Sequence, residues 1–132
     1  MTVAVMGAGA FGTALAISLC KNGPVVLWAR DPANATEMEK NRVNQTRLPH
    51  RPFPPNLRVT SDPDDVRASD IILLAVPTQK LRGLVVNYSG LLDGKYVVAC
   101  CKGYELGTGL GPTSVIAEEV ANVVPAILTG PS

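Results

Sequence analysis

The chain has 132 residues, 46% of them hydrophobic, and a formal net charge of +1. This length fits one domain with a continuous core and leaves little room for two. The lysines and arginines are scattered along the sequence and form no basic stripe, so they do not indicate binding to nucleic acid or to a lipid surface. The longest apolar run, Ile71 to Val76, is too short to span a bilayer, and the first strand begins too near Met1 for a signal peptide. We therefore expect a cytoplasmic protein without membrane insertion.

Apolar runs alternate with helical or irregular stretches along the chain. Helices are expected over Thr13–Asn22, from Asp31-Pro32 to about Asn41, for one turn after Asp62-Pro63, within Leu81–Leu92, and over Thr113–Val124. Buried strands are expected at Thr2–Met6, Val25–Ala29, Leu57–Thr60, Ile71–Val76, Tyr96–Cys101 and Ala126–Thr129. This alternation predicts an α/β fold.

Two further segments carry specific expectations. Between Asn44 and Asn56, a cluster of prolines predicts an ordered loop, and a loop of that length in a compact domain is often functional. In the last helix, Glu118 and Glu119 are expected on a solvated face.

The segment Gly7-Ala8-Gly9-Ala10-Phe11-Gly12 separates the first strand from the first helix. Gly7 allows a tight turn, Gly9 lets the backbone approach a pyrophosphate, and Gly12 permits close packing of helix and strand. The N–H groups of the following helix suit phosphates. The alternative is an ordinary strand-to-helix loop. We interpret the segment as a dinucleotide-binding turn in a Rossmann-type, doubly wound, mainly parallel sheet.

The end of the second strand bears on the choice of cofactor. A fold selective for NAD usually has an acidic residue there, but this chain has Arg30 followed by Asp31. The planar fork of Arg30 can pair with a 2′-phosphate, so NADP is favoured over NAD. The alternative is that Arg30 is merely solvated and Asp31 only caps a helix. Because Asp31 can both cap and touch ribose, NAD remains a second candidate.

The remaining reactive side chains favour no metal or redox site. Cys20, Cys100 and Cys101 are odd in number and lie in apolar segments, as expected of small reduced core residues. A redox role for the adjacent pair is the alternative. No Cys/His cluster has the spacing of a metal site. The only histidine, His50, lies in the proline-rich loop and is expected to be exposed.

Several separated motifs together resemble the N-terminal, cofactor-binding part of NAD(P)-dependent glycerol-3-phosphate dehydrogenases, and the resemblance covers the whole chain. They are the glycine turn, Leu27-Trp28-Ala29-Arg30-Asp31, Leu48-Pro49 followed by Leu57, Ala75-Val76-Pro77-Thr78-Gln79-Lys80-Leu81-Arg82, Cys101-Lys102-Gly103-Tyr104-Glu105 and Thr129-Gly130-Pro131-Ser132. The resemblance implies hydride exchange between NAD(P)H and sn-glycerol 3-phosphate or dihydroxyacetone phosphate, in phospholipid precursor synthesis.

The resemblance also implies roles for individual residues. Those implied to bind cofactor are Gly7, Gly9, Ala10, Phe11, Gly12, Arg30, Arg47, Pro77 and Lys102, and those implied to bind substrate are Lys102, Gly130 and Ser132. Lys102 follows a strand and so stands at the carboxyl edge of the sheet, where ligands of such folds bind. Its position alone fits a solvated loop lysine equally well, and Pro77 could simply terminate a strand.

The resemblance further implies a second, helical domain that carries the general-base lysine, and the full-length enzyme is expected to be a homodimer. Residues 1–132 would then be a Rossmann domain, incomplete at its C-terminal end, with no catalytic base, and inactive alone. Two alternatives remain open at this point. One is a stand-alone NAD(P)-binding sensor, and the other is a different reductase such as a ketopantoate reductase.

Overall fold

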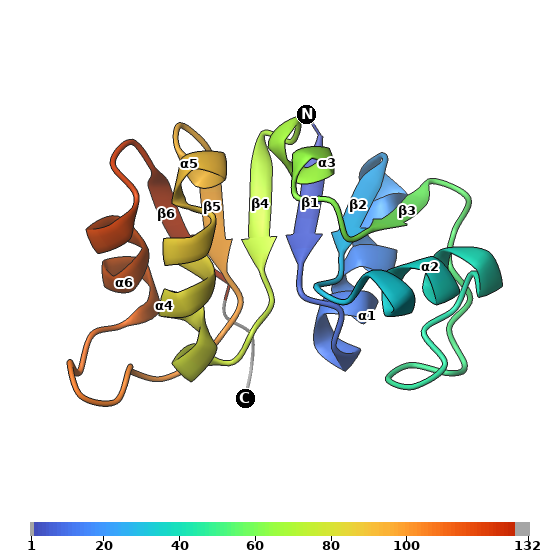
Figure 1. The fold of residues 1–132 in the computed structure, drawn as a ribbon, viewed down its shortest axis with the longest axis horizontal. Helices are drawn as coiled ribbons and strands as arrows, with labels where there is room; N and C mark the ends of the chain where they lie inside the picture. The colour runs from blue at the N-terminus through green and yellow to red at the C-terminus, as the bar shows by residue number, and fades with distance from the viewer. Residues whose placement is uncertain (1, 129–132) are drawn as a thin grey trace.

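The computed structural model describes residues 2–128, which form one parallel sheet with helices on both faces (Figure 1). The strands are β1 (Val3–Met6), β2 (Val25–Trp28), β3 (Leu57–Thr60), β4 (Ile71–Leu74), β5 (Tyr96–Ala99) and β6 (Val124–Ile127). The helices are α1 (Ala10–Leu19), α2 (Pro32–Asn41), α3 (Asp64–Arg67), α4 (Thr78–Asn87), α5 (Ser89–Leu92) and α6 (Pro112–Glu119), with a 3-10 turn at Cys20–Asn22.

The six strands lie in the order β3-β2-β1-β4-β5-β6 and every pair is parallel. From β1 the chain proceeds outward through β2 to β3, and it then returns to β4 on the other side of β1. The strand order therefore reverses between β1 and β4. In doubly wound folds, ligands bind outside the carboxyl ends of the strands at such a reversal. The predicted fold class is confirmed.

Two hydrophobic cores lie on opposite faces of the sheet. Helices α1 and α2 bury Ile17 and Met38 against β1, β2 and β3. On the other face, α4, α5 and α6 bury Leu81, Leu92 and Ile116 against β1, β4 and β5. Figure 1 shows α4, α5 and α6 in front of the sheet, with α1 behind it. Because the central strands contribute to both cores, their four-residue segments are almost wholly apolar.

Several predicted boundaries were wrong by a few residues. Helix α1 begins at Ala10 and not at Thr13, so Gly12 lies inside its first turn. Helix α4 begins at Thr78, directly after Pro77, and α6 ends at Glu119. The run from Val120 to Val124 turns and enters β6, where branched side chains fit better than in a helix.

Glu118 is exposed, as expected, and Glu119 is half-buried, but neither side chain is only solvated. Glu118 Oε1 lies 2.8 Å from Arg82 Nη2 of α4, and Glu119 Oε2 lies 3.0 Å from Arg82 Nη1. Sequence spacing gave no sign of this pairing, because the two helices meet only in the folded chain.

Part of the face opposite α6 is exposed on the two last strands, as far as residues 2–128 show. Tyr96, Val124 and Leu128 share the face opposite α6, and they are 50%, 54% and 41% exposed. This is an apolar strip of the kind that usually marks a contact surface. In the same part of the chain, no helix is long and apolar enough to cross a membrane.

Candidate functional site

The glycine turn connects β1 to α1 at the carboxyl edge of the sheet. Gly7 has φ +120°, and a Cβ atom there would lie 2.3 Å from the Ala75 carbonyl oxygen. A Cβ atom on Gly12 would lie 2.1 Å from the Gly7 carbonyl oxygen. At Gly9 a Cβ atom would meet nothing within 4 Å. Gly7 and Gly12 are therefore required by the turn itself, whereas Gly9 leaves open space in front of it.

That open space lies before the first turn of α1. Gly9 is the N-cap residue, with extended backbone angles and no side chain to cap the helix, and its carbonyl accepts from Thr13 N at 3.0 Å. The first amides of a helix have no partners within the helix and carry the positive end of its dipole. A pyrophosphate fits such a position, because it accepts from those amides and needs close backbone approach.

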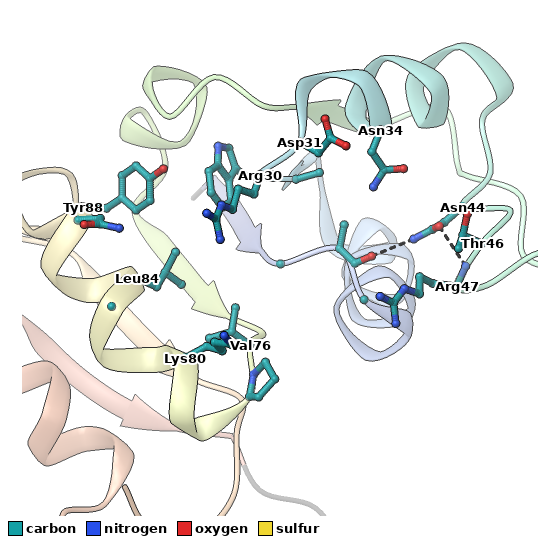
Figure 2. Close-up of a pocket in the computed structure, with 18 residues that line it drawn as sticks. Arg30, Asp31, Asn34, Asn44, Thr46, Arg47, Val76, Lys80, Leu84 and Tyr88 are labelled. Atoms are coloured by element: carbon teal, nitrogen blue, oxygen red, sulfur yellow. Dashed lines mark hydrogen bonds between the residues drawn. The ribbon is translucent and has the colours of Figure 1, made fainter. Parts of the chain in front are cut away.

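A cavity of about 820 Å³ opens beside the turn (Figure 2). Its walls come from the glycine turn, the end of β2, the loop after α2 and one side of α4. The charged side chains that line it are Arg30, Asp31, Arg47 and Lys80, which makes three cations and one carboxylate. The cavity therefore suits an anionic ligand.

The structure brings together five of the residues predicted to bind cofactor around this cavity: Gly7, Gly9, Arg30, Arg47 and Pro77. Arg30 is exposed at the end of β2. Asp31 caps α2, because its Oδ1 accepts from Ala33 N at 3.1 Å, and it also lines the cavity. The capping role predicted for Asp31 is confirmed.

Asn44 fixes the proline-rich loop to the glycine turn. Its side chain is buried, and its Nδ2 donates to the Ala8 carbonyl oxygen and to Thr13 Oγ1, each at 3.0 Å. Its Oδ1 accepts from Arg47 N at 3.2 Å. Figure 2 shows the bonds of Asn44 to Ala8 and Arg47 beside the cavity. Arg47 was predicted at the site, but Asn44, which binds its backbone, was not.

An aromatic pair stands at the β2 end of the cavity. The rings of Trp28 and Tyr88 lie 5.3 Å apart at 73°, an edge-to-face arrangement. Trp28 Nε1 donates to the Ser61 carbonyl oxygen at 3.1 Å, which leaves the indole fixed. Both residues line the cavity, and neither was predicted to do so. Their pairing could not be seen in the sequence, because Tyr88 comes from the C-terminal end of α4, far along the chain from Trp28.

A second cavity, of about 420 Å³, shares Gly9, Val76 and Pro77 with the first. Its lining includes the remaining predicted cofactor residues: Ala10, Phe11, Gly12 and Lys102. The Phe11 ring is 57% exposed although it is a large apolar group. This cavity thus combines an aromatic surface with a cation at the carboxyl edge of the sheet.

The cysteines behave as expected of reduced thiols. All three are free. Cys100 and Cys101 are neighbours in sequence, but they pack on opposite faces of the sheet. Burial, and to a lesser extent the neighbouring Cys101, raise the pKa of Cys100 to about 11, so this thiol at the second cavity is neutral at physiological pH. His50 is exposed, as predicted.

Two predicted substrate residues, Gly130 and Ser132, lie outside the residues that the structure describes.

Residues 2–132 match the family model described as the N-terminus of NAD-dependent glycerol-3-phosphate dehydrogenase. The chain is similar over its whole length to the glycerol-3-phosphate dehydrogenase [NAD(P)+] of Ruegeria sp., at 53% identity, and to that of Roseobacter denitrificans, at 49%. It covers 41% of each of those proteins. The chain therefore spans less than half the length of these curated relatives.

Solved structures agree with this similarity. The glycerol-3-phosphate dehydrogenase of Coxiella burnetii superposes with a TM-score of 0.89 at 32% identity, over 99% of this chain and 41% of that one. The enzyme of Saccharomyces cerevisiae gives 0.80 at 25% identity, over 95% of this chain and 41% of that one. A ketopantoate reductase from Ralstonia eutropha gives 0.70 at 21% identity, over 96% and 40% of the two chains, a likeness of fold alone.

Proposed function

The chain belongs to the family of NAD-dependent glycerol-3-phosphate dehydrogenases, whose N-terminal domain it matches, and we propose a function for it within that family. It is the cofactor-binding domain of an oxidoreductase that interconverts sn-glycerol 3-phosphate and dihydroxyacetone phosphate with NAD(P)H. One observation carries the proposal. The two cavities share Gly9. Three cations, Arg30, Arg47 and Lys80, are among the residues that line the larger cavity, and Phe11 and Lys102 line the smaller one.

The larger cavity fits the adenosine and pyrophosphate part of the cofactor. The open space at Gly9 and the first amides of α1 would hold the pyrophosphate. Ala10 contributes a backbone contact there. Arg47, held in place by Asn44, lies where it can approach the same group. The ring of Trp28 provides an apolar wall at the adenosine end.

The charges of the larger cavity favour NADP over NAD. Arg30 stands at the end of β2, where the ribose of an adenine dinucleotide lies in this fold. Its planar guanidinium can form paired hydrogen bonds with a 2′-phosphate. Lys80 adds a second cation on the opposite wall, from α4. Asp31 remains available for ribose, so NAD is the second cofactor.

The smaller cavity fits the nicotinamide half and the substrate. The cofactor supplies or accepts the hydride. Phe11 would contact the nicotinamide half, and Lys102 would contact both cofactor and substrate. The Lys102 ammonium suits a phosphate group or an alkoxide that develops during hydride transfer. Because Cys100 stays a neutral thiol, it places no competing anion beside that cation. Gly130 and Ser132 would provide further substrate contacts.

The complete enzyme needs parts that lie outside the matched region. We place the general-base lysine and a helical substrate domain in the part of the protein that follows residue 132, because the curated relatives are more than twice as long as this chain. The exposed apolar strip of Tyr96, Val124 and Leu128 offers that part a surface to cover. We further propose a cytoplasmic homodimer that supplies phospholipid precursors.

The experiment is an assay of the full-length gene product. NADPH oxidation, followed by absorbance, should depend on dihydroxyacetone phosphate and should not occur with ketopantoate. The reverse reaction should reduce NADP with sn-glycerol 3-phosphate. Cofactor binding without turnover of either substrate would refute the dehydrogenase assignment and favour a sensor of NAD(P).

A further inference from the structure

The loop between β5 and α6 carries Lys102, and it has little apolar burial to hold it. It contains Gly103, Gly107 and Gly109, all with positive φ. Its large side chains point outward, with Tyr104 71% and Leu106 79% exposed. Figure 1 shows this loop passing the N-terminal end of α4. Since glycines in an exposed loop leave many backbone conformations accessible, something else must fix the position of Lys102.

The first turn of α4 binds the backbone of this loop. Thr78 Oγ1 donates to the carbonyl oxygen of Lys102 itself. Gln79 Nε2 donates to the Tyr104 carbonyl oxygen at 3.1 Å, and Gln79 Oε1 accepts from Leu106 N at 2.9 Å. The side-chain amide of Gln79 thus binds the loop backbone at Tyr104 and at Leu106, both on the C-terminal side of Lys102.

One turn further along α4, Arg82 holds the loop through Glu105. Arg82 Nε lies 2.8 Å from Glu105 Oε2, and Arg82 Nη2 lies 2.9 Å from Glu105 Oε1, a bidentate pair. Thr108 Oγ1 donates to Glu105 Oε1 at 2.6 Å. Hydrogen bonds from Arg82 and Thr108 lower the pKa of Glu105 to about 2, so its carboxylate is charged at any physiological pH.

The same guanidinium reaches Glu118 and Glu119 on α6, so one cation serves three carboxylates from two elements. This cluster therefore has more negative than positive charges, and the Glu105 side chain within it is only 13% exposed. A surface ion pair adds little by itself, but a bidentate pair within a network constrains geometry. Removing Arg82 would leave three carboxylates to repel one another and release the loop.

We propose that Gln79, Arg82 and Glu105 form a clamp that positions Lys102 against the substrate. This inference rests on the proposed function, and it assigns positioning roles to three residues that line neither cavity. None of them touches a reacting atom. Their effect passes through the backbone from 102 to 106, because the clamp fixes the loop after Gly103 while Thr78 holds the Lys102 carbonyl oxygen before it.

The test uses the full-length gene product and two clamp variants, Arg82→Met and Gln79→Ala. Arg67→Met is the matched control, because Arg67 forms an exposed pair with Asp64 on α3 and lines neither cavity. Hydrogen exchange of the amides of residues 102–111 should be faster in both clamp variants and unchanged in the control. Gln79→Ala keeps the experiment decisive if Arg82→Met does not fold.

The kinetic readout separates positioning from general structure. In both clamp variants kcat/KM for dihydroxyacetone phosphate should fall about 10- to 100-fold, the effect expected when a contact group is misplaced by about 1 Å. The Kd of NADPH should rise much less than kcat/KM falls, because the larger cavity, which would hold the adenosine and pyrophosphate part, is intact and Lys102 is only one of the cofactor contacts. Equal losses in substrate kinetics and NADPH affinity, or a released loop with unchanged kinetics, would overturn the clamp. A wild-type protein without turnover would instead refute the proposed function, and unchanged loop exchange would still refute the clamp.

Discussion

The side-chain amide of Asn44 donates to the carbonyl oxygen of Ala8 at 3.0 Å, although the two residues are 36 positions apart. This bond joins the start of the proline-rich loop to the turn that would hold the pyrophosphate. The same amide binds Thr13 Oγ1, and the Asn44 carbonyl oxygen accepts from Arg47 N. The position of Arg47 at the cavity therefore depends on a buried side chain.

Replacing Asn44 should impair both stability and cofactor binding. Asn44→Ala leaves the buried Thr13 hydroxyl without this partner, which should cost about 1–3 kcal/mol of unfolding free energy. NADPH affinity should fall as well, because the loop that carries Arg47 is released. Urea unfolding and a fluorescence titration measure the two effects. The exposed neighbour Gln45, changed to alanine, is the control, and an equal effect there would contradict this role for Asn44.

Gly9 and Gly12 of the turn should respond differently to substitution by valine. Gly9→Val places a branched side chain in the open space before α1, so it should abolish cofactor binding and leave the fold intact. Gly12→Val meets the Gly7 carbonyl oxygen and should unfold or severely destabilise the protein. Circular dichroism and calorimetric titration distinguish the outcomes. Gly90→Val, at an exposed position away from both cavities, should change neither cofactor affinity nor fold.

Arg30 should discriminate between the two nicotinamide cofactors. Arg30→Ala should weaken NADPH binding by about 1–3 kcal/mol, the scale of a hydrogen bond to a charged group, while NADH binding changes much less. Arg51→Ala removes an exposed arginine that lines neither cavity, and it serves as the control. If Arg30→Ala weakens NADH and NADPH equally, Arg30 does not recognise the 2′-phosphate.

Acid should weaken the fold through Glu105. Its pKa is lowered in the folded protein from 4.5 to about 2, so it contributes stability above pH 4.5 that is lost as the pH falls through about 2. Arg82→Met removes the main cause of that lowering. We expect the urea midpoint of the wild type to drop more than that of the variant between about pH 5 and pH 3. Parallel drops would show that the Arg82 pair does not contribute to the acid sensitivity.

The chain of 132 residues should have no detectable catalytic activity by itself. It contains the glycine turn and Lys102, but under the proposed function the general-base lysine lies in the part of the enzyme that this chain does not cover. Losing general acid/base catalysis typically costs about 10² to 10⁴ in rate, and an open substrate site adds to that loss. Absorbance assays should detect no turnover of dihydroxyacetone phosphate with NADPH. Robust turnover by this chain would place the base within it.

Local patterns in the sequence predicted most of the fold and the centre of the candidate site. Short apolar runs identified the strands, and the glycine spacing located the turn, because both depend on neighbouring residues. Asn44, Lys80 and Tyr88 were missed as cavity residues, since their places depend on contacts between distant elements. The pairing of Arg82 with Glu105, Glu118 and Glu119 was missed for the same reason, and an isolated glutamate pair on a helix gives no signal of a partner elsewhere.

Binding of an adenine dinucleotide in the cavity beside Gly9 can be measured by a fluorescence titration. Trp28 is the only tryptophan of the chain and lines that cavity, so its fluorescence reports on occupancy. NADPH should change the Trp28 emission in a saturable way, and Gly9→Val, folded as judged by circular dichroism, should show no saturable change. A folded wild-type chain whose emission does not respond to NADPH or NADH, with no heat of binding by calorimetry, would show that this cavity does not bind the cofactor.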